Sequence, residues 1–170
     1  MGKLKPSITA APPGTKFSDP RVLLATWFGS GLIRPAPGTM GTLLGMPFGY
    51  YILQYGGING LAIAALALLI AATPFATWYG KKSGTVDDQS IVVDEVVGVW
   101  IAGIFAGHSI GLWIWAGLLF RFFDIWKPWP ASFFDDRSKG GFDVMMDDVI
   151  AGLYALCGVA TVALALHMYM

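Results

Sequence analysis

The sequence feature that most constrains the fold is an uncharged apolar run from Ile58 to Tyr79, centred on leucine, alanine and isoleucine. A helix needs about 20 mostly apolar residues to cross a bilayer, so this run is long enough to span one. Charged residues make up only 13% of the chain and apolar residues 55%. A soluble domain usually carries about 25% charged residues. The deficit indicates a surface that faces lipid rather than an unusually large core.

Four further apolar segments have the composition of membrane spans and complete a bundle of about five: Met40–Tyr55, Ile91–Gly107, Ile110–Trp126 and Val149–His167. The glycine-rich link at Gln54–Gly60 predicts a tight turn, so the first two spans should form a helical hairpin. The apolar, glycine-broken segment Arg21–Ile33 is expected to form an interfacial or re-entrant helix. The predicted fold is an all-α, polytopic membrane helix bundle with an interfacial N-terminal helix.

Lysine and arginine favour the cytoplasmic ends of membrane spans. The turns near Gly57 and His108 carry neither. The cations gather at the other ends of the spans: Lys3, Lys5, Lys16, Arg21, Arg34, Lys81, Lys82, Arg121, Lys127, Arg137 and Lys139. This distribution predicts a cytoplasmic N-terminus and an external C-terminus. Residues 1–20 have no apolar core after their lysines, so we expect a flexible cytoplasmic tail rather than a secretion signal, followed by one membrane-embedded domain over residues 21–170.

The acidic residues are concentrated in the second half of the chain, where all except Asp19 lie between Asp87 and Asp148. Carboxylates at membrane depth cost roughly 2.5 to 3.5 kcal/mol each on insertion scales, so they indicate function or mutual pairing. Asp94-Glu95 stands at the head of the third span, and Asp147-Asp148 at the head of the fifth. The predicted topology brings both pairs to the cytoplasmic side.

Small residues follow each acidic pair on the same helix face. Gly98 and Ala102 follow Glu95, while Ala151, Gly152 and Ala155 follow the second pair. Such faces favour close helix contact, which would place the two acidic pairs side by side. The alternative is that each pair only complements the dipole of a solvated helix N-terminus.

A second polar element places Arg121, Asp124 and Lys127 three residues apart, which predicts one shared helix face before Pro128 limits the helix. This pattern could be a simple salt-bridge ladder. Together with the other carboxylates, a site is favoured in which Asp124 joins a metal shell while Arg121 and Lys127 bind phosphate oxygens.

Oxygen ligands without nearby histidine or cysteine suit Mg²⁺ rather than zinc or copper. The candidate catalytic and metal-binding residues are Asp94, Glu95, Asp124, Asp147 and Asp148. Mg²⁺ often shares its ligands with a substrate phosphate, and the added cations also indicate a phosphorylated substrate. Gly38 and Thr39 begin a Gly/Pro-rich helix whose exposed N–H groups would favour an anion, although such a segment can also be only a turn.

Four ordered motifs give the chain a family resemblance: Pro37–Thr42, Ser90–Gly98, Phe120–Pro130 and Asp147–Gly152. Together with Asp87 they resemble the phosphatidylglycerophosphatase A family. The resemblance implies Mg²⁺-dependent hydrolysis of phosphatidylglycerophosphate to phosphatidylglycerol and phosphate in the bacterial inner membrane. It assigns the acids named above, with Asp87 in support, to the site, and Arg121, Lys127, Gly38 and Thr39 to substrate phosphate.

Other functions are compatible with acids in a membrane protein. A CDP-alcohol phosphotransferase would carry an Asp-x2-Asp-Gly-x2-Ala-Arg run, which the sequence lacks. A small ion or metal transporter would place its carboxylates near the bilayer midplane rather than at one end of the spans. Within the phosphatase hypothesis, water attack and a covalent aspartyl-phosphate both stay open. The expected partners are a phospholipid substrate and the membrane, without nucleic acid, and the sequence predicts no oligomeric state.

Overall fold

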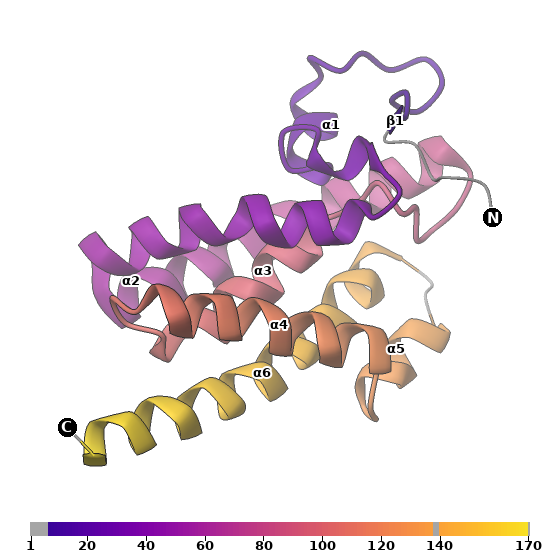
Figure 1. Ribbon diagram of the computed structural model, residues 1–170. Coiled ribbons are helices and arrows are strands. Elements are labelled where there is room, and N and C mark those ends of the chain that lie inside the picture. Colours follow the sequence, from indigo (N-terminus) through magenta and orange to yellow (C-terminus); the bar gives the residue numbers. More distant parts are fainter. Residues whose placement is uncertain (1–6, 138–139, 170) are drawn as a thin grey trace.

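The computed structural model describes residues 7–137 and 140–169, and this part of the chain is mostly helical (Figure 1). The described α-helices are α1 (Pro20–Ala25), α2 (Pro37–Ser83), α3 (Val93–Ala102), α4 (Ile110–Trp126), α5 (Ala131–Arg137) and α6 (Gly141–Tyr169). Two 3-10 helices, η1 (Ser30–Leu32) and η2 (Gly103–Phe105), accompany one antiparallel pair of short strands, β1 (Ser7–Ile8) and β2 (Ile33–Arg34). The prediction of an all-α fold is confirmed.

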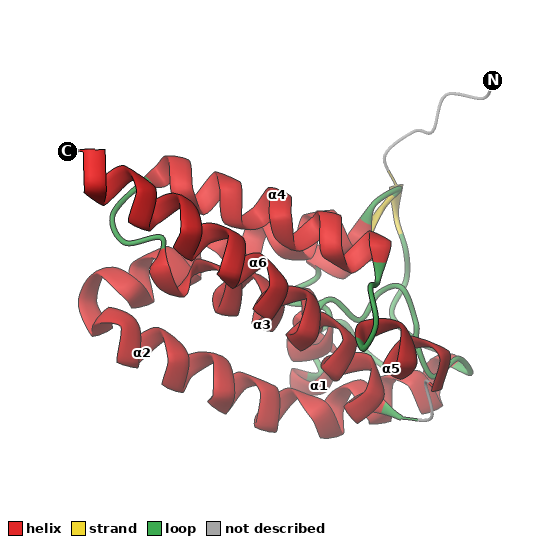
Figure 2. Ribbon diagram, turned by 90° about the horizontal axis from the view of Figure 1, so that it is seen from below, coloured by secondary structure: helices red, strands yellow, loops and turns green. Residues whose placement is uncertain are grey.

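The predicted hairpin of the first two spans lies within α2. The helix is interrupted at Gly57, whose φ of 64° and ψ of −168° are readily reached only by glycine. The chain folds back at this point, so α2 consists of two arms, residues 37–56 and 58–83 (Figures 1 and 2). The bend and the C-terminal end of α6 lie at one end of the molecule, while α1 and α5 lie at the other.

Within the described chain, two helices are long and apolar enough to cross a membrane, namely Pro37–Ser83 and Gly141–Leu166. The other two predicted spans form shorter helices, with 17 residues in α4 and 10 in α3. Nearly all of α3 is buried, and it packs against α2, α4 and α6. This helix is therefore surrounded by other helices of the protein and lies at the centre of the bundle.

The predicted interfacial segment Arg21–Ile33 is not one continuous helix. Its first part is α1, which ends at Ala25, and Trp27 and Phe28 then adopt positive φ values of 43° and 56° before η1. The Trp27 ring packs edge-on against Trp100 of α3, with ring centroids 5.7 Å apart. The segment is therefore a short helix followed by a turn that is anchored on the bundle.

The predicted N-terminal tail, residues 1–20, is described only in part, because residues 1–6 lie outside the described residues. Ser7 pairs with Arg34 and Ile8 with Ile33, so the end of the tail lies beside the segment that leads into α2. At the start of α1, the Asp19 side chain accepts a hydrogen bond from the Arg21 backbone N–H at 2.9 Å, as an N-cap.

The predicted contact between the two small helix faces is confirmed. A Cβ atom on Gly152 of α6 would lie 2.5 Å from the backbone oxygen of Gly98 on α3. Ala102, Ala151 and Ala155 are fully buried beside this contact. Because the two backbones approach so closely, the acidic pairs that precede these glycines come together at one end of the bundle.

Replacing Gly152 by alanine should push α3 and α6 apart and lower the free energy of unfolding by about 1–3 kcal/mol, as overpacking of a core does. The measurement is thermal unfolding of the purified protein in detergent. Gly60→Ala is the matched control, since Gly60 is also a helical glycine and its Cβ would meet only an ordinary contact at 3.8 Å. An unchanged melting temperature for Gly152→Ala would contradict the tight helix contact.

Candidate functional site

The first turn of α3, the start of α6 and the end of α4 meet around a polar pocket of about 280 Å³. The start of α2, at Pro37 and Gly38, and the segment between α2 and α3 complete the lining. Among the described residues, six carboxylates and two cations line this pocket: Asp87, Asp94, Glu95, Asp124, Asp147, Asp148, Arg121 and Lys127. The structure therefore brings together every acidic residue that the sequence proposed for the site, along with both cations.

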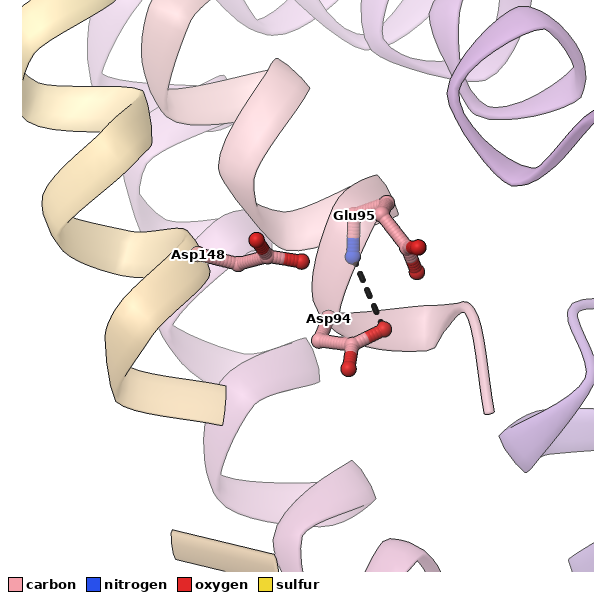
Figure 3. Close-up of side chains that lie close together, drawn as sticks. All are labelled: Asp94, Glu95 and Asp148. Carbon is pink, nitrogen blue, oxygen red and sulfur yellow. Dashed lines mark hydrogen bonds between the residues drawn. The ribbon is translucent and has the colours of Figure 1, made fainter. Parts of the chain in front are cut away.

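Asp94, Glu95 and Asp148 form the tightest group of acids. Each offers one carboxylate oxygen, and the three oxygens lie within 4.8 Å of one another. Asp148 reaches from α6 toward the first turn of α3, where the other two lie (Figure 3). Asp94 and Asp148 are only 5% and 4% exposed. Solvated helix ends would not hold three acids this close and this deeply buried, so the helix-dipole alternative does not explain the cluster.

The two members of each acidic pair have different surroundings. Asp94 accepts a hydrogen bond from the backbone N–H of Glu95 at 3.0 Å, and Asp147 accepts one from Asp148 at the same distance. The first acid of each pair thus uses one oxygen to bind its own helix. Within the described chain, Oε2 of Glu95 is buried and has no hydrogen-bond partner. A buried acceptor of this kind needs a positive ligand or a donor from outside the protein.

The charges of the pocket do not balance. Among the described lining residues, six carboxylates face two cations, an excess of four negative charges if all are ionised. Burying carboxylates without compensation is costly, so the arrangement favours binding of additional positive charge. The donor atoms are all carboxylate oxygens, which are the ligands that Mg²⁺ prefers. The residues present therefore fit a hard divalent cation.

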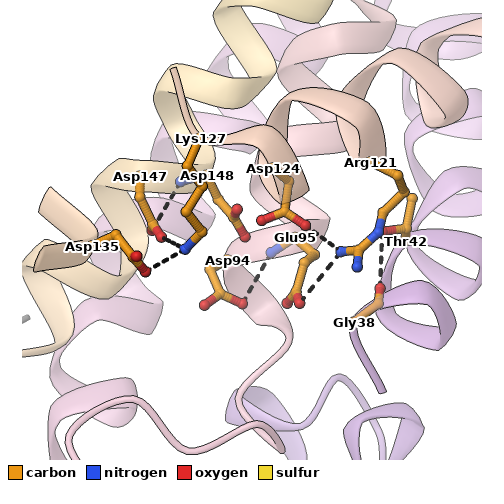
Figure 4. A network of polar contacts seen from close by, with 10 residues as sticks. All are labelled: Gly38, Thr42, Asp94, Glu95, Arg121, Asp124, Lys127, Asp135, Asp147 and Asp148. Carbon is orange, nitrogen blue, oxygen red and sulfur yellow. Dashed lines mark hydrogen bonds and ion pairs between the residues drawn. The ribbon is translucent and has the colours of Figure 1, made fainter. Parts of the chain in front are cut away.

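Arg121 connects α4 to the acidic group (Figure 4). Its Nη1 atom lies 2.5 Å from Asp124 Oδ2 and 3.8 Å from Glu95 Oε1. Its Nε atom is buried and has no hydrogen-bond partner among the residues described. Gly38 allows the start of α2 to lie beside this pair, because a Cβ atom there would stand 2.2 Å from Glu95 Oε1 and 2.9 Å from Arg121 Nη1.

Thr39 does not line the polar pocket, although the sequence placed it with the phosphate-binding residues. It lines a neighbouring apolar groove instead, together with Thr42 and Arg121. The Thr42 hydroxyl, one helical turn after Gly38, donates a hydrogen bond to the Gly38 carbonyl at 2.9 Å. The start of α2 therefore meets the site through Gly38 rather than through Thr39.

Lys127 lies beyond the end of α4, with a left-handed φ of 46°. The prediction that it shares one helix face with Arg121 and Asp124 is wrong, because the helix ends at Trp126. Its Nζ atom lies 2.7 Å from Asp147 Oδ2 and also forms an ion pair with Asp135 of α5. Burial alone would lower the pKa of the Lys127 ammonium group, but the two carboxylates outweigh burial and raise the pKa above its ordinary value. Lys127 therefore stays a cation.

Sequence reasoning did not identify Asp135 or Gln89. Asp135 holds Lys127 in place from α5, and Gln89 lines the mouth of the pocket. The adjacent acids Asp135 and Asp136 were a visible signal. Their connection to the site depends on the turn after α4, which folds α5 back toward Lys127, and no sequence periodicity shows that turn.

Comparison with known proteins adds an independent observation. The family model described as phosphatidylglycerophosphatase A matches residues 23–163, which include every residue of the polar pocket. The chain belongs to the phosphatidylglycerophosphatase A family. The family resemblance of the four motifs is thereby confirmed, and the protein is an enzyme of a lipid phosphatase family.

Two curated relatives support the assignment to the phosphatidylglycerophosphatase A family, and both carry that name. The protein of Haemophilus influenzae is 41% identical over 81% of this chain and 85% of its own length. The protein of Escherichia coli is 37% identical over 81% of this chain and 80% of its own length. A relative from Bacteroides thetaiotaomicron, 38% identical over 82% of this chain and 91% of its own, is provisionally named as a phosphatidylinositol-3-phosphatase. No solved structure matches the chain significantly.

Replacing Lys127 by methionine should leave Asp147 buried without its cation and lower the free energy of unfolding by about 1–3 kcal/mol. The double variant Lys127→Met/Asp147→Asn should lose less than the sum of the two single variants, because the unpaired charge is then gone. Thermal unfolding without added metal measures both effects. Lys82→Met, at an exposed position, serves as the control and should be close to the unmodified protein. Strict additivity of the two pocket substitutions would contradict the ion pair.

Proposed function

We propose that the protein hydrolyses the phosphomonoester of phosphatidylglycerophosphate, releasing phosphatidylglycerol and inorganic phosphate, with Mg²⁺ as cofactor. One observation carries this proposal: buried and partly buried carboxylates from three helices line one pocket together with two cations, in a chain of the phosphatidylglycerophosphatase A family. The names of the relatives supply the substrate, and the chemistry of the pocket supplies the choice of metal.

Asp94, Glu95 and Asp148 would hold the first Mg²⁺, since their oxygens already lie within 4.8 Å of one another. Asp124 and Asp147 line the same pocket and would complete this shell or hold a second ion. A bound Mg²⁺ would supply charge that polarises the phosphoryl group and makes water more acidic.

The protein's own residues have three tasks in this reaction. Arg121 presents a guanidinium whose Nε has no partner within the described chain, and it binds non-bridging oxygens of the phosphate. Lys127 stays cationic at the other side of the pocket and stabilises charge on the phosphoryl oxygens. A pocket carboxylate accepts a proton from the water that attacks phosphorus, and the proton passes to the glycerol oxygen as the phosphorus–oxygen bond breaks.

The same proposal includes the membrane topology. The five spans would be the two arms of α2 followed by α3, α4 and α6, with α1 as an interfacial helix. Large apolar side chains on the outer faces of these helices support a lipid-facing surface; they include Ile63, Ile70, Ile110, Leu118 and Leu164, all at least 60% exposed. The cation of Arg21 stacks 4.0 Å above the Trp78 ring, which ties α1 to the same end of α2 as Lys81 and Lys82.

The cation-rich end of the bundle would face the cytoplasm, and the pocket would then lie at the cytoplasmic face of the bacterial inner membrane. In this arrangement residues 1–20 form a cytoplasmic tail and residues 21–170 the membrane-embedded phosphatase domain. Arg121 and Lys127 lie at the pocket end of α4, whereas the bend at Gly57 and the turn at His108 carry no cation.

Phosphate release from phosphatidylglycerophosphate in detergent tests the activity. We expect Mg²⁺-dependent release that a chelator abolishes, and a loss of more than about 100-fold for Asp148→Asn, because replacing even an outer-shell metal partner costs 10–100-fold. Asp136→Asn is the control, since Asp136 is exposed on α5 and does not line the pocket. Its activity should match the unmodified protein.

Two results would contradict this function. Full activity in chelator would exclude the proposed metal, and full activity of Asp148→Asn would exclude the proposed cluster. The same assay with phosphatidylinositol 3-phosphate tests the substrate named by the Bacteroides relative. Faster release from that lipid would replace the headgroup in the proposal while keeping the phosphatase chemistry.

Thiol labelling tests the proposed topology. In a Cys157→Ser background, His108→Cys should react with a membrane-impermeant maleimide in intact spheroplasts, whereas Lys82→Cys should react only after the membrane is opened. Both positions are exposed and lie at opposite ends of the bundle. Labelling of both from outside would overturn the five-span arrangement.

A further inference from the structure

A groove runs along the outer surface between the first arm of α2 and α4. Its part nearest the site has a volume of about 170 Å³ and is lined by Thr39, Thr42, Leu43, Met46, Ile114, Gly117, Leu118 and Arg121. Its second part, of about 290 Å³, is lined by Leu43, Met46, Pro47, Tyr50, Tyr51, Ile110, Trp113 and Ile114. Leu43, Met46 and Ile114 line both parts, so the two parts adjoin along the same helix faces, and together they are called here the α2–α4 groove.

The sequence explains why the α2–α4 groove is open. Its lining residues recur every three or four positions on each helix, so one face of α2 looks toward one face of α4. Gly117 has no side chain to fill the space, and a Cβ atom there would lie 2.8 Å from Met46 Sδ. A larger residue at this buried position would have to displace Met46 and narrow the groove.

Arg121 connects the groove to the polar pocket, because it lines both. Beyond this cation the lining is mostly apolar, and the Thr42 hydroxyl is already bonded to Gly38. From Arg121 to Ile110, α4 rises about 16 Å. The groove therefore has a cation at its headgroup end and, beyond it, an apolar body of about 16 Å along α4.

We infer that the α2–α4 groove binds one acyl chain of the phospholipid whose phosphate lies at Arg121. This inference rests on the proposed function and deepens it by assigning the lipid part of the substrate to named residues. Leu43, Ile114 and Leu118 are 52%, 53% and 60% exposed. The groove is thus open along its length on the side that would face lipid, and a chain enters it sideways from the leaflet.

The physical effect of the groove is orientation more than affinity. A lipid tail loses little contact with apolar surroundings when it moves from the bilayer into an apolar groove, so burial alone provides a small driving force. A chain fixed beside α4 does, however, hold the glycerol and its phosphate at a set distance from Arg121. Misplacement of a substrate by about 1 Å can cost about 100-fold in rate, so this positioning matters for turnover.

A matched pair of adjacent leucines tests the inference. Leu43 lines the groove and is 52% exposed, whereas Leu44 is 47% exposed and is not among the lining residues. Replacing either leucine by tryptophan adds the same side-chain volume at nearly the same position along α2. The substrates are dioleoyl-phosphatidylglycerophosphate and its deacylated headgroup, glycerophosphoglycerophosphate. We expect Leu43→Trp to lower kcat/KM for the lipid by about tenfold or more through misplacement, with no loss for the headgroup. Leu44→Trp should change neither.

Retained headgroup hydrolysis also shows that Leu43→Trp is folded. An equal effect of the two tryptophans on lipid hydrolysis would overturn the acyl-chain assignment. If the unmodified protein releases phosphate from neither substrate, the proposed function fails. Photolabelling with a lipid that carries a photoreactive acyl chain then tests separately whether the groove binds an acyl chain.

That labelling uses the unmodified protein in vesicles that contain photoreactive-acyl phosphatidylglycerophosphate or, as control, photoreactive-acyl phosphatidylcholine. We expect the phosphomonoester lipid to label Leu43, Met46 and Ile114 several-fold more than Leu44 and Leu66, with no such preference for phosphatidylcholine. The same even labelling of all five positions by both lipids would show ordinary bilayer contact and overturn the inference.

Discussion

The close contact between α3 and α6 is the constraint on which the site depends. Because Gly98 and Gly152 have no side chains, the two backbones approach so closely that a Cβ atom on Gly152 would lie 2.5 Å from the Gly98 backbone oxygen. Each helix carries an acidic pair just before its glycine, so the contact places Asp148 beside Asp94 and Glu95. Larger residues at the contact would separate the helices and, with them, the carboxylates. The packing of small residues in the middle of the bundle therefore determines the chemistry at its end.

The second constraint is charge. The pocket collects more carboxylates than the two described cations can neutralise, and it does so where water is largely excluded from Asp94 and Asp148. Such an arrangement is unfavourable for folding unless it serves a ligand. Arg121 and Lys127 do not neutralise this excess, because each forms an ion pair with a carboxylate at its own side of the pocket. The acidic excess therefore lies at the centre of the pocket, around Asp94, Glu95 and Asp148.

Much of this architecture follows from the sequence. The apolar runs predicted the helices, Gly57 lies within the predicted turn, and the small faces of α3 and α6 predicted their contact. The failures have local causes. Lys127 leaves the α4 helix because the chain turns before Pro128, and the segment after Ala25 breaks its helix through left-handed Trp27 and Phe28. Helical periodicity describes regular segments, so it does not reveal where the chain departs from them.

Arg121 lies on the border between two solvents. On one side it faces a polar pocket and on the other an apolar groove. An enzyme built in this way can release its two products into different surroundings. The phosphate anion diffuses into water, while the dephosphorylated lipid moves sideways into the leaflet that supplied it. Neither product would have to pass the other on the way out.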